Sequence, residues 1–284
     1  MRRVGRAGSI GLALVALVVL ASCAAPAPWT PPQPSPGSLT VMSFNIRHGV
    51  GTDNLLDLDR IARVITTSGA ELVGLQEVDR HFGARSNFVD QATYLAGVLG
   101  MDVAFGANLD LDPLAPGQPR RQYGNAILTR HRITAQDNTL LPRLATSEQR
   151  GLLHVTVDVH GTPVEAYATH LQVDSPAERS QQVAAILGII GTPDASVVLL
   201  GDLNAAPDTP EVAAMVDQLT DAWAAAGVGD GNTFSSQTPT TRIDYVLTSR
   251  DVTARAAAVI ASDASDHRPV VASLALPGSV PPSA

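Results

Sequence analysis

Apolar runs of about eight residues that end in a polar residue recur along the chain from residue 39 onward. Such runs have the length and composition of buried strands. The strands predicted in this way cover residues 39–46, 71–78, 123–130, 151–159, 162–171, 196–204, 242–249 and 267–276. The pair His160-Gly161 between two of these runs predicts a hairpin turn.

Helical spacing of apolar residues, capping glycines and early prolines predict helices between the strands. These helices cover residues 56–69, 88–100, 176–190 and 209–219, and residues 108–122 read as a loop that lines a site. Strand-rich halves that each carry helices favour two packed sheets covered by helices. The pattern alone leaves a single doubly wound sheet open.

The N-terminus has the pattern of an export signal. Arg2, Arg3 and Arg6 precede an apolar stretch, residues 9–20, that is too short to span a membrane comfortably. Residues 20–23 (LASC) are similar to a bacterial lipobox, which predicts a signal peptide over 1–22 and a lipid anchor on Cys23, the only cysteine. The alternative is an ordinary secretory signal cut near Ala24-Ala25.

Composition divides the rest of the chain. Residues 23–38 are rich in proline and predict a tether, residues 39–277 have the length of one domain, and residues 278–284 form a tail. The net charge of -8 disfavours extended binding to nucleic acid. The chain contains no lysine, which excludes Schiff-base chemistry and a lysine-dependent phosphate loop.

Polar residues gather where the predicted strands end. In chain order they are Asn45, Glu77, Tyr123, Asn125, His170, Asp202, Asn204, Asp244, Asp266 and His267. Ligands tend to bind at such sheet edges. Carboxylate, amide and imidazole groups together suit a hard metal ion and a phosphate ester.

Five of these motifs, taken together, carry a resemblance to a known family. SFNI (43–46), LQE (75–77), GDLN (201–204), RIDYVL (242–247) and SDHRPV (265–270) resemble the endonuclease/exonuclease/phosphatase superfamily over about residues 40–276. The resemblance implies a four-layered αββα sandwich of two mainly antiparallel sheets, flanked by helices. It also implies metal-dependent hydrolysis of phosphoesters with Mg²⁺, or with Mn²⁺ or Ca²⁺ in its place.

The resemblance implies a role for each motif residue. The metal ligands are Glu77 as the principal one, Asn45 through its amide oxygen, and Asp266. The catalytic residues are Asp202, which orients or deprotonates the attacking water, Asn204, which holds a phosphate oxygen, His267 paired with Asp244, and His170 at a second phosphate position. Asn125 and Tyr123 correspond to positions near the phosphate.

Arg47 departs from the family pattern, in which many nucleases have an acid two residues after the strand-end asparagine. On extended backbone Arg47 shares a face with Asn45, which predicts contact with a substrate phosphate. The alternative is a structural ion pair with Asp79 or Asp53. His48 directly follows Arg47, and the other histidines, at positions 81, 131, 154 and 160, have no motif around them and read as surface or structural residues.

The predicted function is that of a monomeric, extracytoplasmic phosphodiesterase or phosphatase in the cell envelope. It is lipid-anchored through Cys23 at the outer face of the cytoplasmic membrane, or secreted. A lipid or sugar-phosphate head group is favoured as substrate, because low aromatic content speaks against a stacking surface for nucleic acid. A secreted or anchored nuclease and an inactive binding lipoprotein stay open as alternatives.

Overall fold

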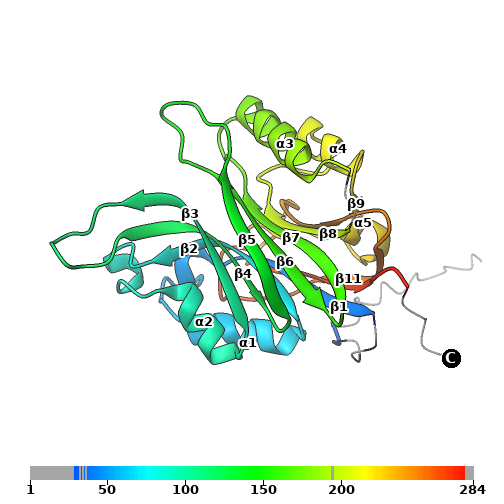
Figure 1. The fold of residues 1–284 in the computed structure, drawn as a ribbon, viewed down its shortest axis with the longest axis horizontal. Helices are drawn as coiled ribbons and strands as arrows, with labels where there is room; N and C mark the ends of the chain where they lie inside the picture. The colour runs from blue at the N-terminus through cyan, green and yellow to red at the C-terminus, as the bar shows by residue number, and fades with distance from the viewer. Residues whose placement is uncertain (1–28, 32, 34, 36, 193–194, 279–284) are drawn as a thin grey trace, which may run out of the picture.

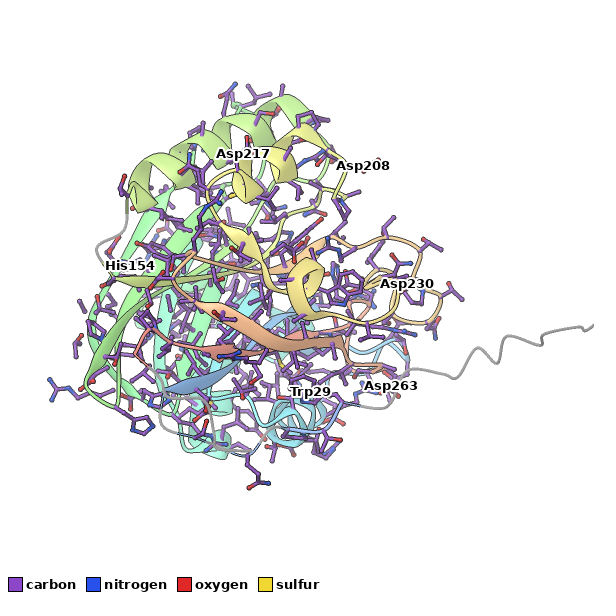
Figure 2. The ribbon with its side chains drawn as sticks, turned by 90° about the vertical axis from the view of Figure 1, so that its right-hand side faces the viewer. Trp29, His154, Asp208, Asp217, Asp230 and Asp263 are labelled. Carbon is purple, nitrogen blue, oxygen red and sulfur yellow. The ribbon has the colours of Figure 1, made fainter. Side chains whose placement is uncertain are left out.

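The computed structural model describes residues 29–31, 33, 35, 37–192 and 195–278. The predicted signal peptide, Cys23, part of the predicted tether and most of the predicted tail lie outside these residues. Trp29, the first described residue, donates from its indole nitrogen to the carbonyl of Ser68 and packs on the apolar cluster around the first helix, residues 58–68 (Figure 2). Within the described part of the chain, no helix combines the length and the hydrophobicity that crossing a bilayer requires.

The first of two six-stranded sheets is built mainly from the N-terminal half. Its spatial order is β11 (Thr253–Val259), β12 (Val270–Ala275), β1 (Ser38–Asn45), β2 (Leu72–Arg80), β4 (Arg121–Thr129) and β3 (Asp102–Leu111). The pair β1 and β2 is parallel, joined by α1 (Leu58–Ser68), and the other neighbours are antiparallel. Asp57 caps the start of α1 and Gly69, at φ 71°, ends it, so the chain returns to β2 at the end of the sheet where β1 began.

The second sheet repeats this pattern with later residues. Its spatial order is β5 (Arg132–Leu140), β6 (Gly151–Val159), β7 (Thr162–His170), β8 (Ser196–Asp202), β10 (Asp244–Thr248) and β9 (Thr220–Asp221). Again one pair, β7 and β8, is parallel and is joined by a helix, α3 (Pro176–Ile190), while the other neighbours are antiparallel.

The two sheets pack face to face with helices outside, which confirms the predicted four-layered sandwich and excludes one doubly wound sheet. Figure 1 shows α1 and α2 (Gln91–Leu99) on the blue and cyan side, and α3 and α4 (Pro210–Val216) on the green and yellow side. The short α5 (Ala222–Ala226) packs on β10 and β11, and two 3-10 turns, η1 (Arg47–Gly49) and η2 (Ala84–Ser86), follow β1 and β2.

The two sheets approach each other very closely in the central core, at Gly74. A Cβ atom on Gly74 of β2 would lie 2.6 Å from the Cβ atom of Leu200 on β8. Real Cβ atoms do not approach so closely, so a glycine is needed there to keep the sheets at their observed spacing. This spacing fixes the distance between the polar strand ends of the two sheets.

The sequence prediction omits four strands, β3, β5, β11 and the two-residue β9, and misplaces several boundaries. The strand β5 reads RITAQDNTL and is largely exposed at a sheet edge, so it lacks the apolar run that the prediction relied on. The alanine-rich β11 lacks that run too, and β3 occupies part of the segment predicted as a loop over 108–122. The predicted strand 196–204 ends earlier, at Asp202, which matters for the site described next.

Candidate active site

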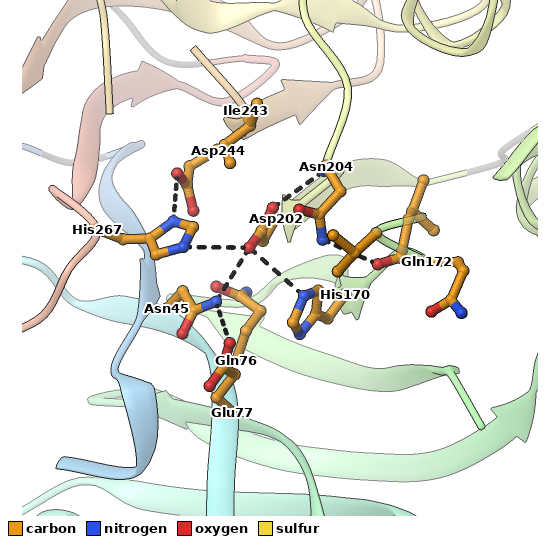
Figure 3. A network of polar contacts seen from close by, with 12 residues as sticks. Asn45, Gln76, Glu77, His170, Gln172, Asp202, Asn204, Ile243, Asp244 and His267 are labelled. Atoms are coloured by element: carbon orange, nitrogen blue, oxygen red, sulfur yellow. Dashed lines mark hydrogen bonds and ion pairs between the residues drawn. The ribbon is translucent and has the colours of Figure 1, made fainter. Parts of the chain in front are cut away.

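Polar residues from both sheets meet at one end of the sandwich. In the first sheet, Asn45 at the end of β1 lies opposite Gln76 on β2. In the second, His170 at the end of β7 lies opposite Asp202, and Asp244 at the start of β10 pairs with Asp202 from the other side. Figure 3 shows these side chains, with that of His267, directed toward one another.

Asn45 connects the two sheets at this point. Its side chain is fully buried, and its amide nitrogen donates to Glu77 Oε1 and to Asp202 Oδ2, both at 3.0 Å. The amide oxygen, which the sequence analysis assigned to a metal, accepts the backbone N–H of Arg47 at 3.0 Å. The structure therefore gives Asn45 a hydrogen-bonding role that orients two carboxylates from different sheets.

His267 is held between two carboxylates. Its Nδ1 lies 2.9 Å from Asp244 Oδ2, and its Nε2 lies 3.7 Å from Asp202 Oδ2. Burial lowers the pKa of His267, but the charges of Asp244 and Asp202 outweigh burial and raise it to about 10. At neutral pH this histidine is an imidazolium that donates from Nδ1 to Asp244 and directs its second N–H, on Nε2, toward Asp202.

His170 has the opposite protonation state because it is buried and its other neighbour is a cation. Arg150 Nη1 lies 3.1 Å from His170 Nδ1, and His170 Nε2 lies 3.5 Å from Asp202 Oδ2. Burial, together with Arg150 and His267, lowers the pKa of His170 well below its ordinary value. Since a guanidinium can only donate, Nδ1 of the neutral ring accepts, and the single ring proton sits on Nε2, facing Asp202.

Arg150 is a site residue that the sequence analysis missed. It is buried, it pairs with Glu148 at 2.7 Å, and its Nε donates to Gln172 Oε1 at 3.3 Å. It stands alone immediately before an apolar strand, and a single arginine in that position carries no motif. Its role becomes visible only when the fold brings β6 beside the end of β7.

Asp202 lies at the centre of this arrangement. It is 1% exposed, and burial, with the nearby charge of Asp244, raises its pKa to about 7. Its Oδ2 faces three side-chain nitrogens, from Asn45, His170 and His267. The donors orient the carboxylate while burial keeps its proton affinity high, which is the combination a general base at neutral pH requires.

Asn204 follows Asp202 in a turn, whereas the sequence analysis expected extended backbone. Its φ is 47°, its N–H donates to Asp202 Oδ1 at 3.0 Å, and its side-chain nitrogen donates to the carbonyl of Leu171 at 3.0 Å. The predicted strand over residues 196–204 is therefore wrong at Asn204. The turn itself brings the Asn204 amide beside the end of β7.

Glu77 reaches the site because β2 is irregular there. Its φ is 58°, and the register of β2 against β4 shifts between Leu75 and Val78. Burial raises the pKa of Glu77, against the hydrogen bond from Asn45. Tyr123 on β4 is buried near Glu77, whose charge adds to burial in raising the pKa of the phenol well above its ordinary value.

Arg47 leaves the strand rather than continuing it. Its φ is 45°, it begins η1, and its Nε lies 3.6 Å from Asp266 Oδ2, with both side chains about one third exposed. The expected shared face with Asn45 is wrong, and the two acids considered as structural partners, Asp79 and Asp53, pair with other arginines. The structure gives Arg47 an ion pair at the rim of the site.

Asn125 lies deeper than a residue that touches a substrate phosphate would. It is fully buried, and its side-chain nitrogen donates to the carbonyls of Gly151 at 3.1 Å and Ala168 at 3.4 Å. These hydrogen bonds run between the two sheets. In this structure Asn125 fixes sheet packing below the site.

The donor groups fit a hard divalent cation beside Glu77. Ligand atoms of Asp202, Asp244 and His267 lie within 4.8 Å of one another, but an imidazolium offers no lone pair to a metal. The nearby negative charge of Asp266 also raises the pKa of the buried Glu77, a repulsion that a cation would relieve. Magnesium needs only one or two carboxylates, so Glu77 with Asp266 is an adequate protein contribution.

Comparison with known proteins agrees with this geometry. The model of the endonuclease/exonuclease/phosphatase family matches residues 42–267. Among solved structures, an endonuclease/exonuclease/phosphatase from Beutenbergia cavernae is 29% identical, with a TM-score of 0.74 over 85% of this chain and 72% of that chain. No curated protein sequence matches the chain.

More distant structures share the fold. Mannosyl-6-phosphatase Bt3783 of Bacteroides thetaiotaomicron is 18% identical, with a TM-score of 0.67 over 83% of this chain and 99% of that chain. The human Nocturnin catalytic domain is 20% identical, with a TM-score of 0.64 over 84% of this chain and 93% of that chain. With the family model matched over most of the domain and the strand-end residues gathered at one site, the chain belongs to the endonuclease/exonuclease/phosphatase family.

Proposed function

We propose that the protein hydrolyses a phosphoester outside the cytoplasm, with a divalent cation, Mg²⁺ first, as cofactor. The observation that carries the proposal is Asp202, a buried carboxylate with a pKa of about 7 that faces three side-chain nitrogens. Such a group can accept a proton from water at neutral pH. The neighbouring side chains Asn45, His170 and His267 carry N–H groups, which can stabilise the negative charge of a phosphoester transition state.

Each residue has a task in the proposed reaction. Asp202 takes a proton from a water whose oxygen attacks phosphorus, while the bond from phosphorus to the leaving oxygen breaks on the opposite side. The imidazolium of His267 donates to the charge that develops on the phosphate oxygens, and Asp244 keeps this ring protonated and oriented. A cation held by Glu77 and Asp266 would supply further positive charge to the same oxygens.

The proposed substrate is the phosphoester of a sugar or lipid head group. The likeness to mannosyl-6-phosphatase Bt3783 agrees with a sugar phosphate, although at 18% identity it shows only a shared fold. The acidic chain, with a net charge of -8, gives little support for tight binding to nucleic acid. The predicted contact of Arg47 with a substrate phosphate is not used in this proposal, because Arg47 forms an ion pair with Asp266.

The proposed location rests on residues 1–23 alone. The export pattern and the LASC motif support a lipid on Cys23, at the outer face of the cytoplasmic membrane. Labelling of producing cells with a fatty-acid analogue should mark the wild type and not Cys23→Ser. Equal labelling of both proteins would contradict the anchor.

A hydrolysis screen tests the activity and its substrate class together. Purified protein with Mg²⁺ or with EDTA is given mannose 6-phosphate, inositol phosphates, sphingomyelin, bis-p-nitrophenyl phosphate and plasmid DNA, and His267→Ala serves as the control. We expect Mg²⁺-dependent release from a sugar or lipid phosphoester that falls about 10²–10⁴-fold in the control. Cleavage of DNA alone would identify a nuclease, and no turnover of any of these substrates would contradict the proposed activity.

A further inference from the structure

A second group of metal-binding side chains lies at the end of the sandwich opposite the active site. Glu71 immediately precedes β2, and the six residue-to-residue steps from it to Glu77 span about 20 Å. His131 lies in the turn from β4 to β5, and His160 in the turn from β6 to β7. Three separate connections thus bring a carboxylate and two imidazoles to this end.

The contact between His131 and Glu71 is too long for a hydrogen bond. His131 Nε2 lies 3.7 Å from Glu71 Oε1. The His131 side chain is only 8% exposed, and its Nε2 is buried with no hydrogen-bond partner among the described residues. A buried ring nitrogen is rarely left without a partner, which suggests that a further group completes this position.

The Glu71 carboxylate is held in place by the backbone of β1. Its Oε2 accepts the N–H of Thr40 at 3.0 Å, which leaves Oε1 toward His131. A hydrogen-bonded carboxylate beside an imidazole is a common pair of metal ligands.

His160 lies beside this pair, and a change of its side-chain rotamer would be needed for a ring nitrogen to reach coordinating distance. Its φ is 52°, and Gly161 follows at φ 88°. The pairing of β6 with β7 extends to Val159 and Thr162, the residues on either side of this two-residue turn. The rings of His160 and His131 meet edge to face with centroids 5.1 Å apart. Because His160 is exposed, its side chain can change rotamer without disturbing the core.

We propose that Glu71, His131 and His160 form a zinc site separate from the active site, with water as fourth ligand. Two ligands about 2.0–2.1 Å from zinc in a tetrahedron lie about 3.3 Å apart. The observed 3.7 Å between Nε2 and Oε1 therefore needs an adjustment of only a few tenths of an ångström. Two imidazoles with one carboxylate select zinc, or the neighbouring nickel and copper, over magnesium.

Occupation of this site would tie the two sheets together at the end that the active site does not bridge. Glu71 precedes a strand of the first sheet, and His160 lies between two strands of the second. The expected effect of zinc is thus on stability, since a ligand that binds only the folded chain favours folding. The proposal is independent of phosphoester hydrolysis.

Zinc titration in saturating Mg²⁺ tests the site, because Mg²⁺ occupies oxygen ligands at the active site. Calorimetry and thermal melting of the wild type should show one zinc equivalent and a raised Tm. His160→Ala and His131→Gln should each weaken the binding at least about tenfold, while His81→Ala, which removes a histidine near η2, should match the wild type. His160→Ala changes an exposed side chain and keeps the comparison valid if His131→Gln folds poorly.

Three results would overturn the proposal. One is that zinc binds equally well to wild type, His160→Ala and His131→Gln. Another is that zinc fails to bind the wild type in the presence of Mg²⁺. The third is that Glu77→Gln, and not His160→Ala, abolishes zinc binding, which would assign the metal to the active site.

Discussion

Replacement of Asp244 by asparagine should remove most of the pH dependence of stability between pH 7.5 and 9. In the metal-free wild type, His267 has a folded pKa of about 10, above its ordinary value of 6.5. Between these values the folded protein binds a proton that the unfolded chain has released. The contribution of His267 to stability is therefore complete below pH 6.5 and is lost as the pH rises toward 10.

The magnitude follows from the width of that window. Each pH unit inside it removes up to about 1.4 kcal/mol, so 1.5 units remove about 2 kcal/mol of unfolding free energy. Asp202 has a raised folded pKa of about 7, so its own loss of stability runs from about pH 4 to 7 and is largely over before the window begins. The charge of Asp244 is the largest of the influences that raise the pKa of His267, so without it the folded pKa falls toward its ordinary value and the slope across the window becomes smaller.

Urea denaturation in EDTA at pH 7.5, 8.25 and 9 measures these slopes. The amide oxygen introduced by Asp244→Asn can still accept from His267 Nδ1, so the variant should fold, and any fixed loss of stability leaves the slope unaffected. Asp230→Asn, which removes an exposed acid (Figure 2), is the matched control and should keep the wild-type slope. Parallel slopes for wild type and Asp244→Asn would refute the assignment of His267 as a buried imidazolium.

Three further changes follow from the geometry. Glu77→Gln should weaken divalent-cation affinity by calorimetry at least about tenfold, and unchanged affinity would remove Glu77 from the metal site. Arg150→Gln can still donate to His170 Nδ1 and should keep more kcat than Arg150→Leu; an equal loss would leave Arg150 without a positioning role. Gly74→Ala meets a leucine Cβ on β8 at 2.6 Å and should destabilise by about 1–3 kcal/mol in urea, whereas Gly97→Ala, with no atom within 4 Å, should not.

The layers of the fold and the residues of the site could be predicted from the sequence, whereas the backbone conformation of the site residues was predicted less well. Buried strands such as β8 can be recognised by their apolar runs. The motifs SFNI, GDLN and SDHRPV show where polar groups follow such runs. Edge strands such as β5 were missed, because exposure to solvent removes the apolar pattern. Their place is set by pairing with a neighbour, which a single strand's sequence does not show.

The backbone conformations that were misjudged at the site share one cause. Arg47, Glu77 and Asn204 all adopt positive φ, at a turn, a bulge and a turn, where extended backbone was expected or assumed. Such conformations in residues other than glycine are held by tertiary contacts, and in the sequence they look like ordinary strand ends. Arg150 was missed for a related reason, because its partner His170 lies on a neighbouring strand.

The matching strand orders of the two sheets give the domain an approximate internal two-fold relation. Read across, β11-β12-β1-β2-β4-β3 corresponds to β5-β6-β7-β8-β10-β9, position by position and with the same parallel and antiparallel pairings. Asn45 and Gln76 close the parallel pair in one half, as His170 and Asp202 do in the other. The candidate active site thus takes residues from both halves of the domain. The 3.0 Å hydrogen bond from Asn45 to Asp202 joins the two halves. Sliding of one half on the other would disturb that contact, together with the hydrogen bonds of Asn125 between the sheets, so turnover would report on how the two halves are packed.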